Sequence, residues 1–274
     1  MKQPLEGGEV SKLRSFKIHE IYSTMRLPPT TPFIVRCDGR NFRSLCSRLG
    51  FKKPFDEDFA KIMVAAAKAV YNSGFNPTLA YIQSDEISYL FTKEQIFNRR
   101  LEKILSIIPS LISSRFTLEL SKIKGVEEVA AFDARIVALA ESDIVDYFAW
   151  RQMEAWRNHI NAYALHALIK RGMTTSQAAK KLYKMKSPEL HDLVMKELNV
   201  NLAKTPAWQR RGIVLRWRVV EKQGINPVTG EASLTIRRWL TEDWDPPLFT
   251  SPEGRKYLEE AILAAEKEIS NTRD

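Results

Sequence analysis

The first part of the chain alternates short hydrophobic runs with a stretch of helical periodicity. Residues 33–37 form a strand-like hydrophobic run that stops at Asp38-Gly39, where glycine permits a sharp turn. Hydrophobic positions between residues 56 and 72 recur at helical spacing, which predicts an amphipathic helix with one face on the core. Asp56 is a start signal for this helix.

A hairpin is predicted after this helix. Two more strand-like runs cover residues 79–82 and 87–91, and their tight connection contains Ser84, Asp85 and Glu86. Each of the two hydrophobic strands therefore ends beside a carboxylate.

The elements up to residue 140 complete a recognisable order. A second helical stretch covers residues 94–122, with a break expected at Pro109. Residues 130–139 return to a strand pattern. The order β-α-β-β-α-β is that of a split, ferredoxin-like sheet, which polymerase palm domains also use. We expect an α+β fold with this sheet in residues 1–140.

The second region, residues 141–274, is predicted to be mostly helical. A long helix begins at Ser142 and ends at Gly172, and two more begin at Thr175 and Ser187. A long hairpin with strands at 212–222 and 233–240 turns around 226–230. A final charged helix ends at Asp274.

The charge balance favours a polyanionic partner. The 274 residues carry a formal net charge of +9 and an isoelectric point near 9.5, which predicts attraction to nucleic acid or anionic membranes. A basic protein with no nucleic-acid role is the alternative. Cys37 and Cys46 are the only cysteines, and no signal-peptide pattern or apolar run of about 18 residues is apparent. We expect a cytoplasmic protein with no membrane association.

Asp38 and Asp85 are the strongest candidates for chemistry. Both follow hydrophobic strands, and the interval between them suits a strand, a helix and a hairpin strand, so both carboxylates can lie at adjacent strand ends. Asp-Gly is also a common turn dipeptide. Carboxylates crowded at one sheet edge repel each other unless a cation joins them, and Mg²⁺ prefers oxygen ligands. Glu86 would point to the opposite side of its strand, as an alternate ligand.

Basic residues surround this acidic centre in sequence. Lys52 and Lys53 precede the first helix, and Arg100 and Lys103 lie one helical turn apart on the second. The late hairpin interleaves cations with indoles, which favours phosphate contact, although solvated edge-strand charges explain it nearly as well. The candidate RNA-binding residues are Arg210, Arg211, Arg216, Arg218 and Arg237. The four histidines lack metal-site spacing, and His159 and His166 are predicted core residues.

Six ordered motifs between about residue 15 and residue 220 carry a resemblance to the tRNA-His guanylyltransferase family, including its template-dependent 3′-to-5′ polymerase members. They lie at residues 35–42, 53–56, 83–88, 99–103, 132–135 and 146–152. Eukaryotic members have His-Ile-Asn-Asn where this chain has Trp156 to His159. Phe55 and Ala134 also differ from the usual asparagine and glycine. The pattern is closer to the archaeal and bacterial branch, which implies templated addition.

The resemblance implies a palm-like catalytic domain in residues 1–140 and a region, 141–274, that contributes to tRNA binding and assembly as a homotetramer. Asp38 and Asp85 would be the shared carboxylates of two Mg²⁺ ions, with the Gly39 carbonyl and Glu86 as further ligands. ATP would activate the 5′ phosphate of tRNA, and the 3′-hydroxyl of GTP would attack it. Residues expected to bind the nucleoside triphosphate are Arg40, Asn41, Phe42, Arg43, Lys53, Asp56, Ser84, Arg100, Lys103 and Arg135.

Two alternatives remain open from the residues alone. Two aspartates on a palm sheet do not determine direction, so a nucleotidyl cyclase or a conventional 5′-to-3′ nucleotidyltransferase would use the same pair. A non-catalytic basic RNA-binding protein could hold a structural cation between the same acids. Metal-dependent release of pyrophosphate separates the enzymes from the binding protein.

Overall fold

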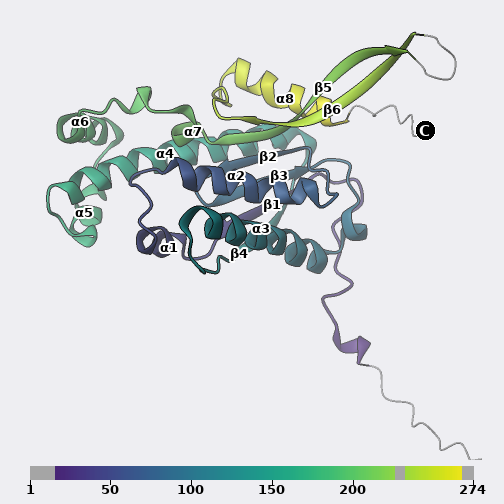
Figure 1. Cartoon of the computed structure of the whole chain (residues 1–274), viewed down its shortest axis with the longest axis horizontal. Helices are drawn as coiled ribbons and strands as arrows, with labels where there is room; N and C mark the ends of the chain where they lie inside the picture. Colours follow the sequence, from purple (N-terminus) through teal and green to yellow (C-terminus); the bar gives the residue numbers. More distant parts are fainter. Residues whose placement is uncertain (1–15, 226–231, 267–274) are drawn as a thin grey trace, which may run out of the picture.

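A single antiparallel sheet organises the protein in the computed structural model, which describes residues 16–225 and 232–266 (Figure 1). The six strands lie in the order β4-β1-β3-β2-β5-β6. Their bounds are β1 Phe33–Gly39, β2 Leu79–Gln83, β3 Glu86–Phe91, β4 Phe132–Ala138, β5 Ile213–Ile225 and β6 Ala232–Asp243. The helices are α1 Phe42–Arg48, α2 Glu57–Asn72, α3 Leu101–Lys124, α4 Ile144–Lys170, α5 Thr175–Leu182, α6 Ser187–Leu198, α7 Ala207–Arg211 and α8 Pro252–Glu266.

Strands β1 to β4 with α2 and α3 form the predicted split β-α-β-β-α-β unit, so the α+β class and its ferredoxin-like order are confirmed. Strand alternation divides the side chains between two cores. Phe33, Val35 and Cys37 face α2 and α3, while Ile34 faces α4 and α8. Helices therefore cover both faces of the sheet, and the strand ends stay open for a site.

Helix α2 begins where the sequence indicates. Asp56 is its N-cap, and the Asp56 carboxylate accepts hydrogen bonds from the backbone N–H groups of Asp58 and Phe59 at 2.9 and 3.2 Å. The cap connects the start of the helix to the preceding Lys52-Lys53 loop, because the same carboxylate accepts the Lys52 N–H at 2.7 Å. A helix-start signal thus also holds a basic loop in place.

The expected break at Pro109 does not occur. Helix α3 runs continuously through Pro109, and the hydrophobic residues on both sides of it, Ile104, Ile108 and Ile112, are fully buried. Proline inside a helix costs about 3 kcal/mol, a cost that burial of this apolar stripe offsets. The helix also begins later than predicted, after a 3₁₀ turn at Ile96–Arg99 with positive φ angles.

By length and composition, α3 alone among the helices in the described ranges could cross a membrane. In this fold it is a core helix: Phe116 and Leu120 are fully buried, and α3 packs against α2 and β4. The apolar character of α3 is explained by that packing.

The late hairpin extends the sheet. Strand β5 pairs with β2 from Leu79↔Arg216 to Ile82↔Ile213, and β6 pairs with β5. Helix α8 packs on β5. The predicted turn at residues 226–230 and the predicted helix end at Asp274 lie outside the described residues.

Candidate active site

The end of β1 and the tip of the β2–β3 hairpin lie side by side. The Gly39 N–H donates to the Asp85 carbonyl at 3.0 Å, and Asp38 is paired in register with Glu86 of β3 and Asp133 of β4. A Cβ on residue 39 would lie 2.5 Å from the Phe42 ring, so this turn accepts only glycine without rearrangement. The structure therefore brings Asp38, Gly39 and Asp85 to one edge of the sheet.

The two carboxylates are electrostatically unfavourable without a cation. Burial, and then the charge of Asp38, raise the pKa of Asp85, while a hydrogen bond donated by the Ser84 hydroxyl at 3.0 Å and the charge of Lys53 oppose that rise. No hydrogen-bond donor within the described ranges contacts the Asp38 carboxylate. A bound cation would neutralise both groups.

The donor set fits Mg²⁺. The described residues contain no cluster of three or more His, Cys, Asp or Glu side chains placed to hold a metal. Mg²⁺, however, is usually bound by one or two carboxylates together with water and substrate phosphates. Asp38 and Asp85 with the Gly39 carbonyl are such a set.

A cavity of about 490 Å³ opens beside the carboxylates. Basic side chains line one wall, formed by α1 and the loop before α2, where Arg43, Lys52 and Lys53 are exposed. Helix α4 supplies the opposite wall. The sequence-predicted residues that line this cavity are Asp38, Phe42, Arg43, Lys53, Asp56, Ser84, Asp85 and Glu86.

Asp56 lines the cavity, but both of its oxygens are already bonded. Burial raises its pKa, yet hydrogen bonds from the backbone of Lys52, Phe59 and Asp58 outweigh burial and lower it below the ordinary value. Asp56 therefore stays ionised and positions the Lys52-Lys53 loop.

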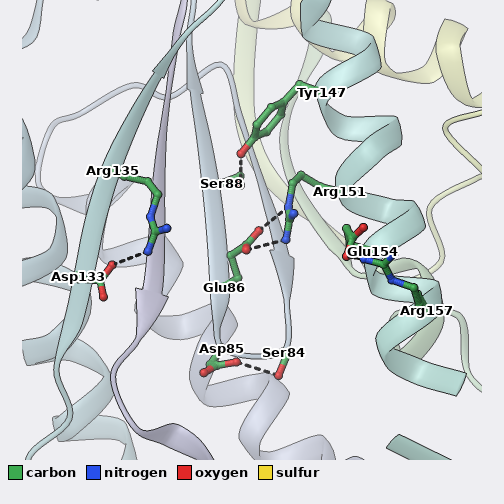
Figure 2. A network of polar contacts seen from close by, with 10 residues as sticks. All are labelled: Ser84, Asp85, Glu86, Ser88, Asp133, Arg135, Tyr147, Arg151, Glu154 and Arg157. Carbon is green, nitrogen blue, oxygen red and sulfur yellow. Dashed lines mark hydrogen bonds and ion pairs between the residues drawn. The ribbon is translucent and has the colours of Figure 1, made fainter. Parts of the chain in front are cut away.

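Glu86 is held by a residue that sequence reasoning had not assigned to the site. Arg151 of α4 donates from Nε and from one terminal nitrogen to the two Glu86 oxygens at 2.9 and 2.7 Å (Figure 2). Both side chains are nearly buried, at 9% and 13% exposure. Burial raises the pKa of Glu86 and Arg151 opposes the rise. Because the guanidinium occupies both oxygens, the structure argues against Glu86 as a metal ligand.

Two signals in the sequence point to Arg151: it belongs to the motif at residues 146–152, and it is a charged residue among apolar positions of a helix. It lies among Tyr147, Phe148 and Ala155 on the side of α4 that packs on the sheet. A buried arginine needs a carboxylate, and the sequence does not reveal which one.

Several predicted nucleotide-binding residues lie elsewhere. Arg100 and Lys103 are at the opposite end of the sheet. The Arg99 guanidinium donates to the Thr31 carbonyl just before β1, and the Arg100 backbone forms an isolated β-bridge with Arg26. Seven residues of β1, about 20 Å, separate that end from the carboxylates. Within one chain, Arg100 and Lys103 cannot contact the cavity.

Three of the remaining predicted residues, Arg40, Asn41 and Arg135, lie outside the cavity. Arg40 and Asn41 are exposed, Asn41 precedes α1 with a left-handed backbone, and Phe42 packs on Phe116 and Phe132. Arg135 pairs with Asp133 at 3.2 Å on the edge strand (Figure 2). None of Arg40, Asn41 or Arg135 lines the cavity.

His159 is a core residue, as predicted. It is fully buried, and its Nε2 is 2.9 Å from the Thr205 hydroxyl. Burial, followed by the charges of Arg210 and His191, lowers the pKa of His159 to about 4, so the ring is neutral at physiological pH.

Comparison with known proteins decides the family. The family model for tRNAHis guanylyltransferase matches residues 11–140, and the model for the Thg1 C terminal domain matches residues 142–246. The chain belongs to the tRNAHis guanylyltransferase family. Members of this family are nucleotidyltransferases, so the predicted family and enzyme class are confirmed.

Relatives match over most of the chain. A probable tRNA(His) guanylyltransferase of Drosophila melanogaster is 36% identical over 198 residues, which is 70% of this chain and 69% of the relative. A bacterial tRNA(His) guanylyltransferase-like protein, solved in complex with ATP, has a TM-score of 0.70 at 27% identity, covering 89% of this chain and 95% of that one. The Saccharomyces cerevisiae enzyme has a TM-score of 0.65 at 28% identity, covering 73% and 92%.

The arginines expected to bind RNA in this guanylyltransferase family member differ in accessibility. Arg216 is mostly buried: its guanidinium lies 4.1 Å from the Tyr257 ring centre and 3.8 Å from the Asp243 carboxylate. Arg216 therefore exposes less of its side chain to a bound RNA than Arg218 and Arg237 do. Arg218 and Arg237 are exposed, whereas Arg210 and Arg211 are half-buried in the wall of another, larger cavity.

Proposed function

We propose that this protein adds a guanine nucleotide, or templated nucleotides, to the 5′ end of tRNA-His in the 3′-to-5′ direction. One observation carries the proposal: the half-buried carboxylate pair Asp38 and Asp85 lines a cavity together with Arg43, Lys52 and Lys53, in a chain of the tRNAHis guanylyltransferase family. Nucleotidyl transfer requires carboxylates that bind a metal cation and, next to them, basic side chains that bind phosphates.

Mg²⁺ would be held by the Asp38 and Asp85 carboxylates and the Gly39 carbonyl. When bound, it would lower the pKa of an attacking hydroxyl and neutralise charge on the phosphates. The chain's own groups do the rest. Lys53 and Arg43 bind the triphosphate, and the Ser84 hydroxyl orients Asp85. Bidentate pairing with Arg151 keeps Glu86 away from the phosphates.

Two successive transfers make up the proposed reaction. The 5′-monophosphate of tRNA attacks the α-phosphorus of ATP and releases pyrophosphate. The 3′-hydroxyl of GTP then attacks the activated 5′ phosphorus and releases AMP. Solved complexes of a bacterial relative with ATP and with GTP support nucleotide binding of both kinds by this fold. The tetramer and the cytoplasmic location stay predictions.

The test is 5′-end extension of a tRNA-His transcript that carries a 5′-monophosphate and lacks the extra guanosine. With ATP, GTP and Mg²⁺, we expect a product one nucleotide longer, with one AMP released per addition. Growth at the 3′ end would indicate a conventional nucleotidyltransferase, and a cyclic nucleotide would indicate a cyclase. Either result contradicts the proposal.

Nucleotide choice is proposed to depend on the template base. Trp156 to His159 replace the His-Ile-Asn-Asn stretch of eukaryotic members, and pairing geometry can supply the discrimination that the protein would otherwise need. G should be added more efficiently opposite C than opposite A. Equal efficiency on the two transcripts would refute templating.

A further inference from the structure

We propose that a second cavity, on the other side of α4 from the carboxylates, binds an unpaired nucleotide from the single-stranded 3′ tail of the RNA substrate. This inference rests on the proposed function, because it assigns a place to the strand that pairs with the extended 5′ end. It goes beyond that function by naming a recognition site that the 5′-end chemistry does not require.

The second cavity is larger and more apolar than the first. Its volume is about 1220 Å³, and it is enclosed by α4, the α5–α6 segment, α7 and the loop after β6. Hydrophobic side chains form most of its lining, among them Trp156, Ile160, Leu182, Leu190 and Leu248. Arg157, Arg210 and Arg211 also line it, together with one acid, Glu154, which forms an ion pair with Arg157. A flat base with a phosphate attached matches that combination of apolar surface and guanidinium groups.

Helix α4 is the wall that both cavities share. Arg151, Ala155 and Asn158 face the carboxylate cavity, whereas Trp156 and Ile160 face the larger one. An α-helix with its side chains is about 10–12 Å across. In a tRNA acceptor end the 5′ nucleotide is paired and the 3′ strand continues as an unpaired tail. With the 5′ end at Asp38 and Asp85, the width of α4 separates the larger cavity from the acceptor end that carries the tail.

The rim of this cavity has the charge and the exposed ring that single-stranded RNA requires. Tyr183 is 87% exposed on the α5–α6 connection. No Asp or Glu occurs from Thr174 to Pro188. The lysines of this segment are Lys180, Lys181, Lys184 and Lys186; all are exposed, and none forms an ion pair with a described residue. Lysines that attract phosphates beside an aromatic ring that stacks on bases are typical of single-strand binding sites.

A second copy of this chain is the competing occupant. The segment from Phe16 to Met25 extends away from the sheet (Figure 1). Its exposed apolar side chains include Phe16, Ile18 and Tyr22. Between Phe16 and Arg26, however, Lys17 and Arg26 outweigh Glu20. A positive segment is repelled by a lysine rim, and a polyanion is attracted. The charges favour RNA.

The experiment compares two tRNA transcripts, one with its unpaired 3′ tail and one trimmed to a blunt acceptor end. Affinities of the full-length protein are measured by fluorescence anisotropy. We expect the tail to increase affinity roughly ten-fold in the wild type, as base stacking on an aromatic ring does. Tyr183→Ala should remove most of that increase and leave the affinity for blunt RNA unchanged. Tyr22→Ala, also at an exposed tyrosine, is the matched control and should retain the full increase.

A second variant tests charge separately. Replacing Lys180, Lys181 and Lys184 with Gln should lower the salt dependence of binding for the tailed transcript more than for the blunt one. Because these side chains are exposed, both variants should fold, which melting curves check.

Three outcomes would overturn the inference. If Tyr183→Ala lowers the affinity for the tailed and the blunt transcript equally, Tyr183 contacts the double-stranded part of the RNA and not the tail. No loss for either would exclude RNA from the cavity. A changed sedimentation mass in Tyr183→Ala, with unchanged RNA affinity, would assign the cavity to a second copy. Failure of the proposed function is separate, because wild-type protein would then extend neither transcript whatever the binding result.

Discussion

The two cavities beside α4 are built from different parts of the fold and from different residue types. The carboxylate cavity lies at the strand ends, where half-buried acids and the Lys52-Lys53 loop line the same small space. The larger cavity lies among helices and combines apolar walls with a basic rim. The charged groups of the first cavity are fixed in position by strand ends and by a capped helix. Such fixed geometry is what a catalytic site requires. An open apolar surface with flexible lysines suits recognition.

The largest expected effect would separate chemistry from recognition. Asp38→Ala or Asp85→Ala should reduce nucleotide addition by at least about a thousand-fold, because several kcal/mol of transition-state stabilisation depend on the held cation. Single-turnover extension of tRNA-His measures this. Asp133→Ala is the matched control, since Asp133 neighbours Asp38 in register but is exposed and paired with Arg135.

Both aspartate variants should bind the tailed transcript as tightly as the wild type does. Near-normal turnover by a folded Asp38 or Asp85 variant would contradict the carboxylate assignment. Loss of tail-dependent binding in either one would contradict the separation of the two cavities.

The next largest effect is on folding stability, through the ion pair that joins Arg151 of α4 to Glu86 of β3. Arg151→Met leaves Glu86 buried without its partner and should lower the free energy of unfolding by about 3–5 kcal/mol. Urea denaturation measures this. The double variant Glu86→Gln/Arg151→Met removes the stranded charge and should recover most of the loss. If the single and double variants are equally unstable, packing rather than charge makes the Arg151 contribution.

A moderate effect concerns the cation. Asp85 has a raised pKa in the folded protein, so the folded state binds this proton more tightly than the unfolded chain does. The stability from that proton is present below the unfolded value near 3.8 and is lost as the pH rises through the folded-state pKa. At neutral pH, without divalent cations, Asp85→Asn should melt higher than the wild type.

Added Mg²⁺ should reverse that order. It should raise the melting temperature of the wild type by roughly 2–4 °C for each kcal/mol of binding, with no rise in Asp85→Asn. An equal response of both proteins to Mg²⁺ would place the cation elsewhere.

The smallest expected effect concerns the hairpin. Arg218 and Arg237 are exposed, and replacing both with Gln should lower the salt slope of tRNA binding by at most about two units. Arg216→Gln is the control: it should lower thermal stability through lost contacts with Tyr257 and Asp243 and leave the slope unchanged. A change of slope in Arg216→Gln alone would reverse this assignment.

The amino-acid sequence by itself determined the element order of the split sheet and the meeting of Asp38 with Asp85. Both follow from local rules: alternation and helical periodicity specify strands and helices, and the end of a strand can be read from its last apolar residue. Asp56 at the start of α2 belongs to the same class, because a cap acts on its nearest neighbours.

Only the tertiary structure decided which distant groups meet. Arg151 pairs with Glu86, Arg216 lies against Tyr257, β5 extends the sheet at β2, and Arg100 lies far from the carboxylates. Packing also keeps α3 continuous through Pro109. The physical reason is the same in each case. A buried charge requires an opposite charge, and an unpaired strand requires a hydrogen-bonding neighbour. Several residues distant in the sequence could meet either requirement, and the packing of the core selects one of them.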